Sequence, residues 1–159
     1  RGLATASHLA PRTKLHGDLL KARASTQVVT GSVQPALADL LAAHEIYRHI
    51  DDARSQAIAL QNIGSLYLEA RDYERALRYY RQANGAYSAD PALALAAHNN
   101  RGNALKEIGR YEEAQREFQQ ALEASRALES DLLQARILTN LASAQLLDGD
   151  IAQPEATAR

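Results

Sequence analysis

The sequence predicts an all-α protein built from about four repeated helix pairs. Alanine, leucine, glutamate, arginine and glutamine dominate the 159 residues, and aromatic residues make up only 5%. This composition favours helix over strand. The stretch 62–83 returns at 100–121 and again from Asn140, so that Asn62, Asn100 and Asn140 lie 38 and then 40 residues apart. A repeat of this length is typical of a stacked architecture, in which no unit can bury its apolar face alone.

A weaker copy precedes these three, one period earlier. Two columns of small residues support this register: Ala36, Ala76 and Ala114, with Pro154 at the equivalent place, and Ala43, Ala83 and Ala121. We expect one repeat domain over residues 17–159, with units at about 17–52, 53–91, 92–130 and 131–159, the last of them truncated. Residues 1–16 show no sustained helical period, and we interpret them as an N-terminal arm, either disordered or a short helix.

The first pair begins with small and apolar residues at helical spacing from Asp18 to Val28, and Gly31 ends that helix. Pro35 then lies in the first turn of the second helix, where its missing N–H has no intrahelical partner to lose. A broad apolar stripe from Ala36 to Tyr47 follows, which predicts that this helix packs back on the first.

The later helices follow the same scheme. Asp51 and Asp52 suit the start of a helix over 53–70, and Arg71 and Asp72 form the turn before a helix over 73–87. Pro91 is well placed as the first residue of the next helix, which runs to 108; Gly109 separates it from a helix over 111–128. We expect a seventh helix over 132–147, a turn at Gly149, and a fourth pair continuing from Ile151.

Small residues midway along the first helices should allow the second helices to approach closely. These are Ala24, Gly64, Gly102 and Ala142. Larger side chains should then fill the space between adjacent pairs, namely Leu60, Tyr67, Tyr80 and Phe118.

Composition excludes several classes of function. Eighteen basic and nineteen acidic side chains give a net charge of −1, which provides no general field for nucleic acid or an anionic membrane. No apolar run approaches the roughly 18–20 residues that cross a bilayer. The absence of cysteine fits a cytoplasmic or a periplasmic location. Because the chain starts at Arg1 and stops within a repeat, we interpret it as a piece of a longer protein.

The sequence shows no catalytic or metal-binding motif. None of the five histidines lies three or four residues from another, the spacing that helical metal sites use. There is no nucleophile elbow, phosphate-binding glycine loop or zinc motif. We therefore expect neither an enzyme nor a cofactor-binding protein.

The repeated unit resembles the tetratricopeptide repeat (TPR). The residues that agree with its pattern are Leu60, Gly64, Tyr67, Asp72, Tyr73, Ala76, Tyr80, Ala83, Asp90 and Pro91. The resemblance implies a right-handed solenoid whose concave groove, lined by the first helix of each pair, holds a peptide or helix of a partner protein. The spacing of 38–40 residues exceeds the family's usual 34 and is similar to that of kinesin light chains and of bacterial sensor and regulator proteins.

The same resemblance implies a set of groove-facing residues. The candidate partner-binding residues are Asn62, Ser65, Glu69, Asn99, Asn100, Asn103, Lys106, Arg136, Asn140 and Ser143. The wider set also includes Asp18, Lys21, Ser25, Val28, Val29, Ile58, Gln61, Leu68, Ala96, Glu107, Thr139, Leu146 and Leu147.

The recurring asparagines form the most specific part of this set. Asparagine is a poor mid-helix residue, so a row of them on one face suggests a role, and an amide both donates and accepts hydrogen bonds, as the backbone of a peptide requires. The competing interpretation is that each amide bonds a neighbouring helix or faces water. Lys106 and Arg136 resemble part of a clamp for a carboxylate, although Asn99 and Gln61 stand where that clamp has lysine.

Three functions are compatible with these observations. The first is a scaffold that binds a protein or peptide in the groove, without nucleic acid and without insertion into a membrane. The second is the sensory or regulatory region of a larger bacterial signalling protein, such as a kinase, a cyclase or a transcription regulator. The third is a homodimer that forms through the uncapped last repeat.

Overall fold

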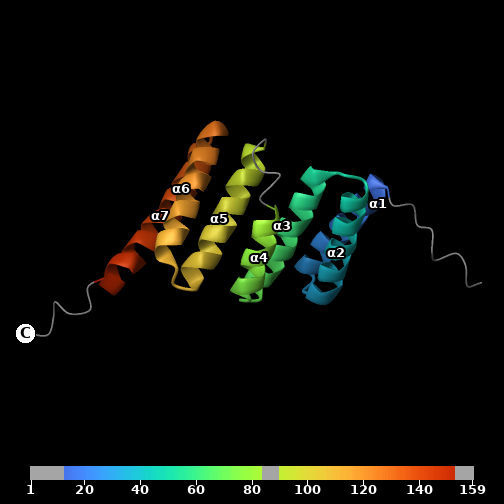
Figure 1. The fold of residues 1–159 in the computed structure, drawn as a ribbon, viewed down its shortest axis with the longest axis horizontal. Helices are drawn as coiled ribbons and strands as arrows, with labels where there is room; N and C mark the ends of the chain where they lie inside the picture. The colour runs from blue at the N-terminus through green and yellow to red at the C-terminus, as the bar shows by residue number, and fades with distance from the viewer. Residues whose placement is uncertain (1–12, 84–89, 153–159) are drawn as a thin grey trace, which may run out of the picture.

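The computed structural model describes residues 13–83 and 90–152, and these form seven α-helices joined by turns (Figure 1). The helices are α1 (Lys14–Val29), α2 (Val33–His49), α3 (Ala53–Glu69), α4 (Tyr73–Ala83), α5 (Pro91–Glu107), α6 (Tyr111–Ala127) and α7 (Asp131–Ala152). The described ranges contain no strand. Each helix packs against the next one along the chain, from α1 at one end of the stack to α7 at the other. The predicted all-α stack of helix pairs is confirmed.

The turns between helices share one backbone geometry. Their middle residues have positive φ angles: Gly31 (76°), Asp51 (55°), Arg71 (59°), Gly109 (78°) and Glu129 (50°). In the turn after α3, the amide of Asp72 donates to the carbonyl of Tyr67 at 2.8 Å, and equivalent bonds close the turns after α1, α2 and α5. This pairing satisfies carbonyls that the end of a helix leaves open. The described turns after α1, α2, α3, α5 and α6 have three residues each, and helices α2, α3, α5 and α6 have 17 residues each.

Helices α3, α4 and α5 each start after an aspartate. The Asp52 carboxylate accepts from the Ser55 amide at 3.0 Å, and Asp72 accepts from the Arg75 amide at 3.1 Å. Asp90 caps α5 in the same manner, with Pro91 as the first helical residue. These bonds satisfy amides that have no partner within the helix, so the predicted cap at Asp52 and the predicted helix start at Pro91 are confirmed.

The core consists of alanine columns with aromatic rings set against glycines. The columns are almost fully buried, at 0–2% exposure: Ala36, Ala43, Ala76, Ala83, Ala114 and Ala121. Tyr80 lies against Gly64, and Phe118 lies against Gly102, so closely that a Cβ on either glycine would sit 2.5 Å from the ring. Tyr80 therefore packs within its own helix pair, and the prediction that it fills the space between pairs is wrong. Phe118 also belongs to a buried cluster with Leu77 of the preceding pair and Ile137 of the following pair, as predicted. Leu60 does lie between pairs, in a cluster with Ala83, Leu93 and Ala97.

In the first helix pair, the aromatic ring packs at a different position along the first helix. Here Tyr47 packs on Gly17, where an added Cβ would lie 2.7 Å from the ring. Ala24, predicted as the equivalent small residue, is buried against Ala36 and Leu40 instead. Helix α1 begins at Lys14, earlier than the predicted start at Asp18, because the Thr13 hydroxyl accepts from the His16 amide and caps it there. Residues 1–12 lie outside the described part of the chain.

The last helix runs past its predicted end. Helix α7 continues through Gly149 to Ala152, so the turn expected at Gly149 is wrong. The amide of Gln115 in α6 donates to Asp148 at 3.0 Å, which holds this last part of α7 against its neighbour. Pro154 and the end of the helix expected to reach residue 87 lie outside the described residues.

Candidate functional site

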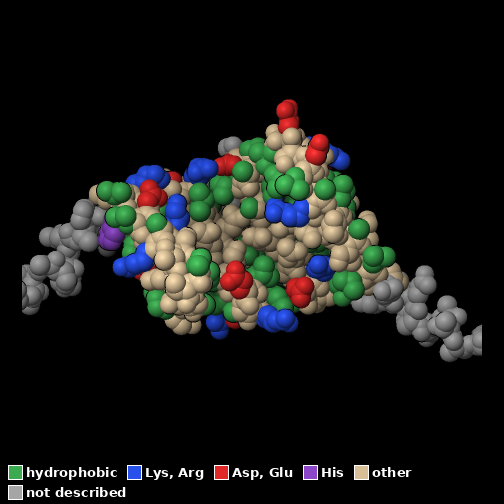
Figure 2. All heavy atoms as spheres, turned by 180° about the vertical axis from the view of Figure 1, so that it is seen from behind, with side chains coloured by type: hydrophobic (Ala, Val, Ile, Leu, Met, Phe, Trp, Pro, Cys, Tyr) green, Lys and Arg blue, Asp and Glu red, His purple; other side chains and the backbone are tan. Residues whose placement is uncertain are grey.

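The helices form two layers, and we call the open surface of α1, α3, α5 and α7 the first-helix face. Within this layer α3 contacts α5 and α5 contacts α7, whereas no comparable contact joins α2 to α4 or α4 to α6 in the described ranges. Helices α3, α5 and α7 therefore lie closer to one another than the helices of the second layer do. Figure 2 shows the molecule from behind: atoms of the backbone and of uncharged, non-hydrophobic side chains fill much of the middle of that view, with hydrophobic and charged groups scattered among them.

The candidate residues lie on three of these helices. Asn62, Ser65 and Glu69 come from α3; Asn99, Asn100, Asn103 and Lys106 come from α5; Arg136, Asn140 and Ser143 come from α7. Each of them is at least partly exposed. Gln61, from the wider predicted set, is an exception because it is 7% exposed and belongs to the interior.

Several of the predicted amides bond from one first helix to the next. We call the boundary between two neighbouring first helices a seam. Asn140 Nδ2 donates to Asn99 Oδ1 at 2.8 Å, which joins α7 to α5. Asn100 Nδ2 donates to Ser65 Oγ at 3.4 Å, which joins α5 to α3, and Ser65 also contacts the Tyr80 hydroxyl at 3.2 Å. These contacts match the competing interpretation, in which the amides tie neighbouring helices together. Each of the three amides uses one donor or acceptor in these bonds, which leaves its other donors and acceptors available.

Asn62 and Asn103 are different, because neither side chain bonds another residue in the described part of the chain. Both are half-buried on the first-helix face. Their donors and acceptors can therefore bond a ligand without breaking an internal contact. Lys106 and Arg136 likewise form no ion pair with a described residue. A carboxylate clamp remains a prediction.

A pocket of about 220 Å³ opens between α1 and α3 on this face. Its lining comes from Ala24, Ser25 and Val28 of α1, Leu40 of α2, and Asn62, Ser65, Leu66 and Glu69 of α3. The sequence identified Asn62, Ser65 and Glu69 as candidates, yet it gave no signal for a pocket. The spacing between α1 and α3 creates it, and that spacing depends on contacts between distant segments.

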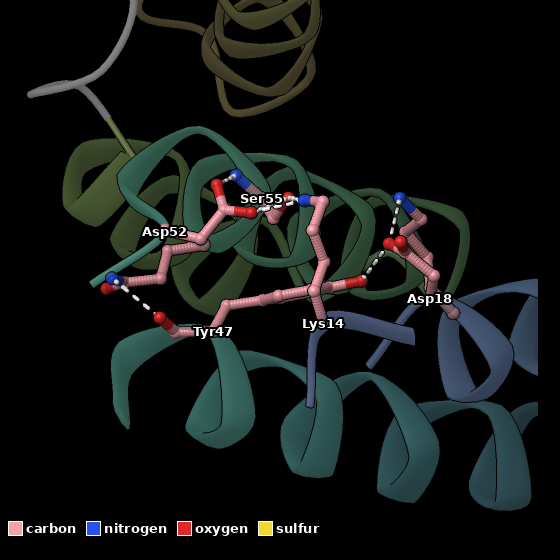
Figure 3. A network of polar contacts seen from close by, with 7 residues as sticks. Lys14, Asp18, Tyr47, Asp52 and Ser55 are labelled. Carbon is pink, nitrogen blue, oxygen red and sulfur yellow. Dashed lines mark hydrogen bonds and ion pairs between the residues drawn. The ribbon is translucent and has the colours of Figure 1, made fainter. Parts of the chain in front are cut away.

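One such contact joins the N-terminal ends of α1 and α3 (Figure 3). Lys14 Nζ forms an ion pair with the Asp52 carboxylate and donates to Ser55 Oγ at 2.8 Å. Burial raises the pKa of Asp52, but hydrogen bonds from Lys14 and Ser55 outweigh that effect and lower its pKa to about 2. Beside this bridge, the Tyr47 hydroxyl donates to Asp18 at 2.8 Å. Burial, followed by this bond, raises the pKa of Tyr47.

The described residues contain no group of three or more side chains suited to hold a metal ion. A charged cluster with little exposure lies between α5 and α6. There, Glu117 pairs with His98 at 2.8 Å and with Arg101 at 2.9 Å. Within the described ranges, no helix is long and apolar enough to cross a bilayer.

Comparison with known proteins decides the family. A family model described as "Tetratricopeptide repeat" matches residues 18–87 and 93–153, which is most of the chain. The chain belongs to the tetratricopeptide repeat family. A sequence search of curated proteins found no match to this chain.

Solved TPR structures share its fold. The Sgt2 TPR domain from Aspergillus fumigatus is 20% identical, with a TM-score of 0.69 over 90% of this chain and 87% of that one. A TPR-like protein from Chlorobium tepidum is 21% identical, with a TM-score of 0.64 over 81% of this chain and 94% of that one. At this level of identity the likeness establishes the TPR solenoid. The family and fold make the chain a protein–protein interaction module in general terms.

Proposed function

We propose that the first-helix face binds an extended peptide or a helix of a partner protein. The observation that carries this proposal is the pocket between α1 and α3. The Asn62 amide lies at its edge and forms no hydrogen bond with another described residue. Asn103 offers a second uncommitted amide on α5. An amide bonds the backbone N–H and C=O of a peptide at once, and a pocket beside it can receive a side chain.

Charge supports a protein partner over a nucleic acid. The net charge of the chain is −1. On the first-helix face, the acidic Glu69 and Glu107 offset Lys106 and Arg136. Binding to nucleic acid depends on neutralising a row of phosphates, for which this face has no continuous basic surface.

A binding selection tests the proposal. Peptides enriched from a random phage-displayed library on the whole chain are synthesised with a fluorescent label, and their Kd is measured by anisotropy. The double variant Asn100→Ala, Asn103→Ala should weaken them by about tenfold or more, about 1.4 kcal/mol, because it removes two amides from the middle of the face. The matched control, Gln119→Ala with Gln120→Ala, removes two exposed amides from the outer helix α6.

The control variant should bind with unchanged affinity, and circular dichroism should show the same helix content in all three proteins. Equal affinity for the wild type and the α5 variant refutes binding through this face. Binding through this face is also refuted if the α6 variant weakens peptide binding to the same extent.

A second candidate function is self-association through α7. This helix exposes large apolar side chains: Leu132 is 81% exposed, Leu146 71% and Leu138 49%. Such a surface is suited to pairing with another copy. Sedimentation velocity should then show a mass that rises with concentration, and Leu138→Lys with Leu146→Lys should abolish the rise, whereas Leu15→Lys on α1 should preserve it. A monomer at all concentrations refutes this function.

A further inference from the structure

The seams between the first helices are not equivalent. Side-chain bonds close two of them: Ser65 with Asn100 between α3 and α5, and Asn99 with Asn140 between α5 and α7. The seam between α1 and α3 is bridged at the N-terminal ends of these helices, by Lys14. Their C-terminal halves border the pocket, which separates them there.

The floor of this pocket is apolar. Leu40 is 2% exposed and Leu66 is 6% exposed, and the half-buried Val28 lies beside them. The volume of about 220 Å³ compares with roughly 30 Å³ for a water molecule in the liquid, so the pocket has room for a long side chain. Methylene groups placed on this floor would be removed from water, which favours binding in proportion to their apolar area.

The rim has polar groups that are free to accept hydrogen bonds. The hydroxyl of Ser25 donates to the Lys21 carbonyl at 3.1 Å, which leaves its lone pairs available. The Asn62 amide and the Glu69 carboxylate make no hydrogen bond or ion pair with a described side chain. A ligand group that donates several hydrogen bonds is therefore the natural complement of this rim.

The charge of the pocket has one sign. Glu69 is the only charged residue in its lining, and no lysine or arginine contributes to it. Glu69 is also the last residue of α3, and α1 ends next to Val28, at Val29. The C-terminal ends of both helices carry partial negative charge, which adds to that of the carboxylate. A cation is favoured here, and an acidic side chain is disfavoured.

We propose that this pocket anchors a lysine or arginine side chain of the bound partner. The aliphatic stem lies on Val28, Leu40 and Leu66, and the cationic head lies beside the Glu69 carboxylate. Long basic side chains bury their stems in this manner while the charge stays at a polar rim. A leucine would fill the floor but leave Asn62 and Glu69 without hydrogen bonds at the covered rim, which costs free energy. This inference rests on the proposed function, since it names the residue that the face recognises.

The test uses the labelled peptides selected on the whole chain. They should share a lysine or arginine at one position. Glu69→Gln should weaken them by roughly tenfold or more, the loss of one charge-assisted hydrogen bond. Glu123→Gln is the matched control, because it removes an exposed carboxylate from the outer helix α6, and it should bind with unchanged affinity. Replacing the basic residue of the peptide with norleucine, which keeps the stem, should make the Glu69→Gln protein and the wild type bind equally.

The outcomes separate this inference from the proposed function. Peptides that depend on Asn100 and Asn103, yet share no basic residue or are insensitive to Glu69→Gln, overturn the anchor and leave the binding face intact. A consensus leucine or acidic residue has the same consequence. A selection that enriches no peptide overturns both.

Discussion

Replacing Gly64 with alanine should destabilise the protein, although alanine is the better helix former. Gly64 lies in the middle of α3 beneath the ring of Tyr80. A Cβ at this position would meet Tyr80 Cε1 at 2.5 Å and Cδ1 at 2.7 Å. Tyr80 has little freedom to move, because it is 0% exposed and its hydroxyl contacts Ser65 at 3.2 Å.

Two opposing contributions determine the size of the effect. Alanine in place of a mid-helix glycine stabilises by roughly 0.5–1 kcal/mol. Overpacking a well-filled core costs roughly 1–3 kcal/mol, and a contact this short with a fixed ring lies at the upper end. The net loss for Gly64→Ala is therefore about 1–2 kcal/mol, which lowers the Tm of a chain of this size by about 2–8 °C.

Urea and thermal unfolding, followed by circular dichroism, measure this loss. The matched control is Gly149→Ala in α7, where an added Cβ has nothing within 4 Å and the backbone is helical. That control should stabilise the protein by about 0.5–1 kcal/mol. In a Tyr80→Leu background, Gly64→Ala should cost less than it does in the wild type, because the clashing ring atoms are absent. If Gly64→Ala stabilises the protein as much as Gly149→Ala does, the proposed role of the Tyr80 ring is wrong.

Three further variants test other parts of the structure. Gly109→Ala should cost about 1–2 kcal/mol in urea unfolding although the site is open, because φ is +78° there; an unchanged midpoint would contradict this. Phe118→Ala should cost about 3–5 kcal/mol, since the ring is 0% exposed; a loss below that of Gly109→Ala would refute its role in the core. Asp52→Asn should reduce the unfolding free energy at pH 7, and the difference should shrink as the pH falls from about 4 to about 2, because the carboxylate has a pKa of about 2 in the folded protein and 3.8 ordinarily. A difference that is independent of pH would show that the charge on Asp52 has no part in it.

Local features of the fold could be predicted from the sequence because they depend on neighbouring residues. Asp52 and Pro91 indicate helix starts through rules that span one turn, and Gly31 and Gly109 mark positive φ. Gly149 suggested a helix end for the same reason, because a glycine after a helical stretch often marks one. Helix α7 continues past it to Ala152, and the bond between Gln115 and Asp148, 33 residues apart, holds α7 against α6 just before the glycine.

The sequence could place the candidate residues on their helices but could not predict their contacts. Asn62, Asn100 and Asn140 were identified by their equivalent places in the repeats, and Asn99 by its position beside Asn100. Whether an amide stays uncommitted, as in Asn62, or bonds another helix, as Asn140 bonds Asn99, depends on the spacing between helices. Periodicity carries no information about that distance.

By itself, the sequence determined that equal helix pairs stack through small residues and leave a polar face along their first helices. The tertiary structure alone decided which seams of that face are closed, where the pocket lies, and that Gly17 rather than Ala24 receives the aromatic ring of the first pair. The reason is physical. Helix propensity, capping and turn geometry act within a few residues, whereas the separation of two helices follows from side chains far apart in the chain, such as Lys14 and Asp52, that meet only after folding.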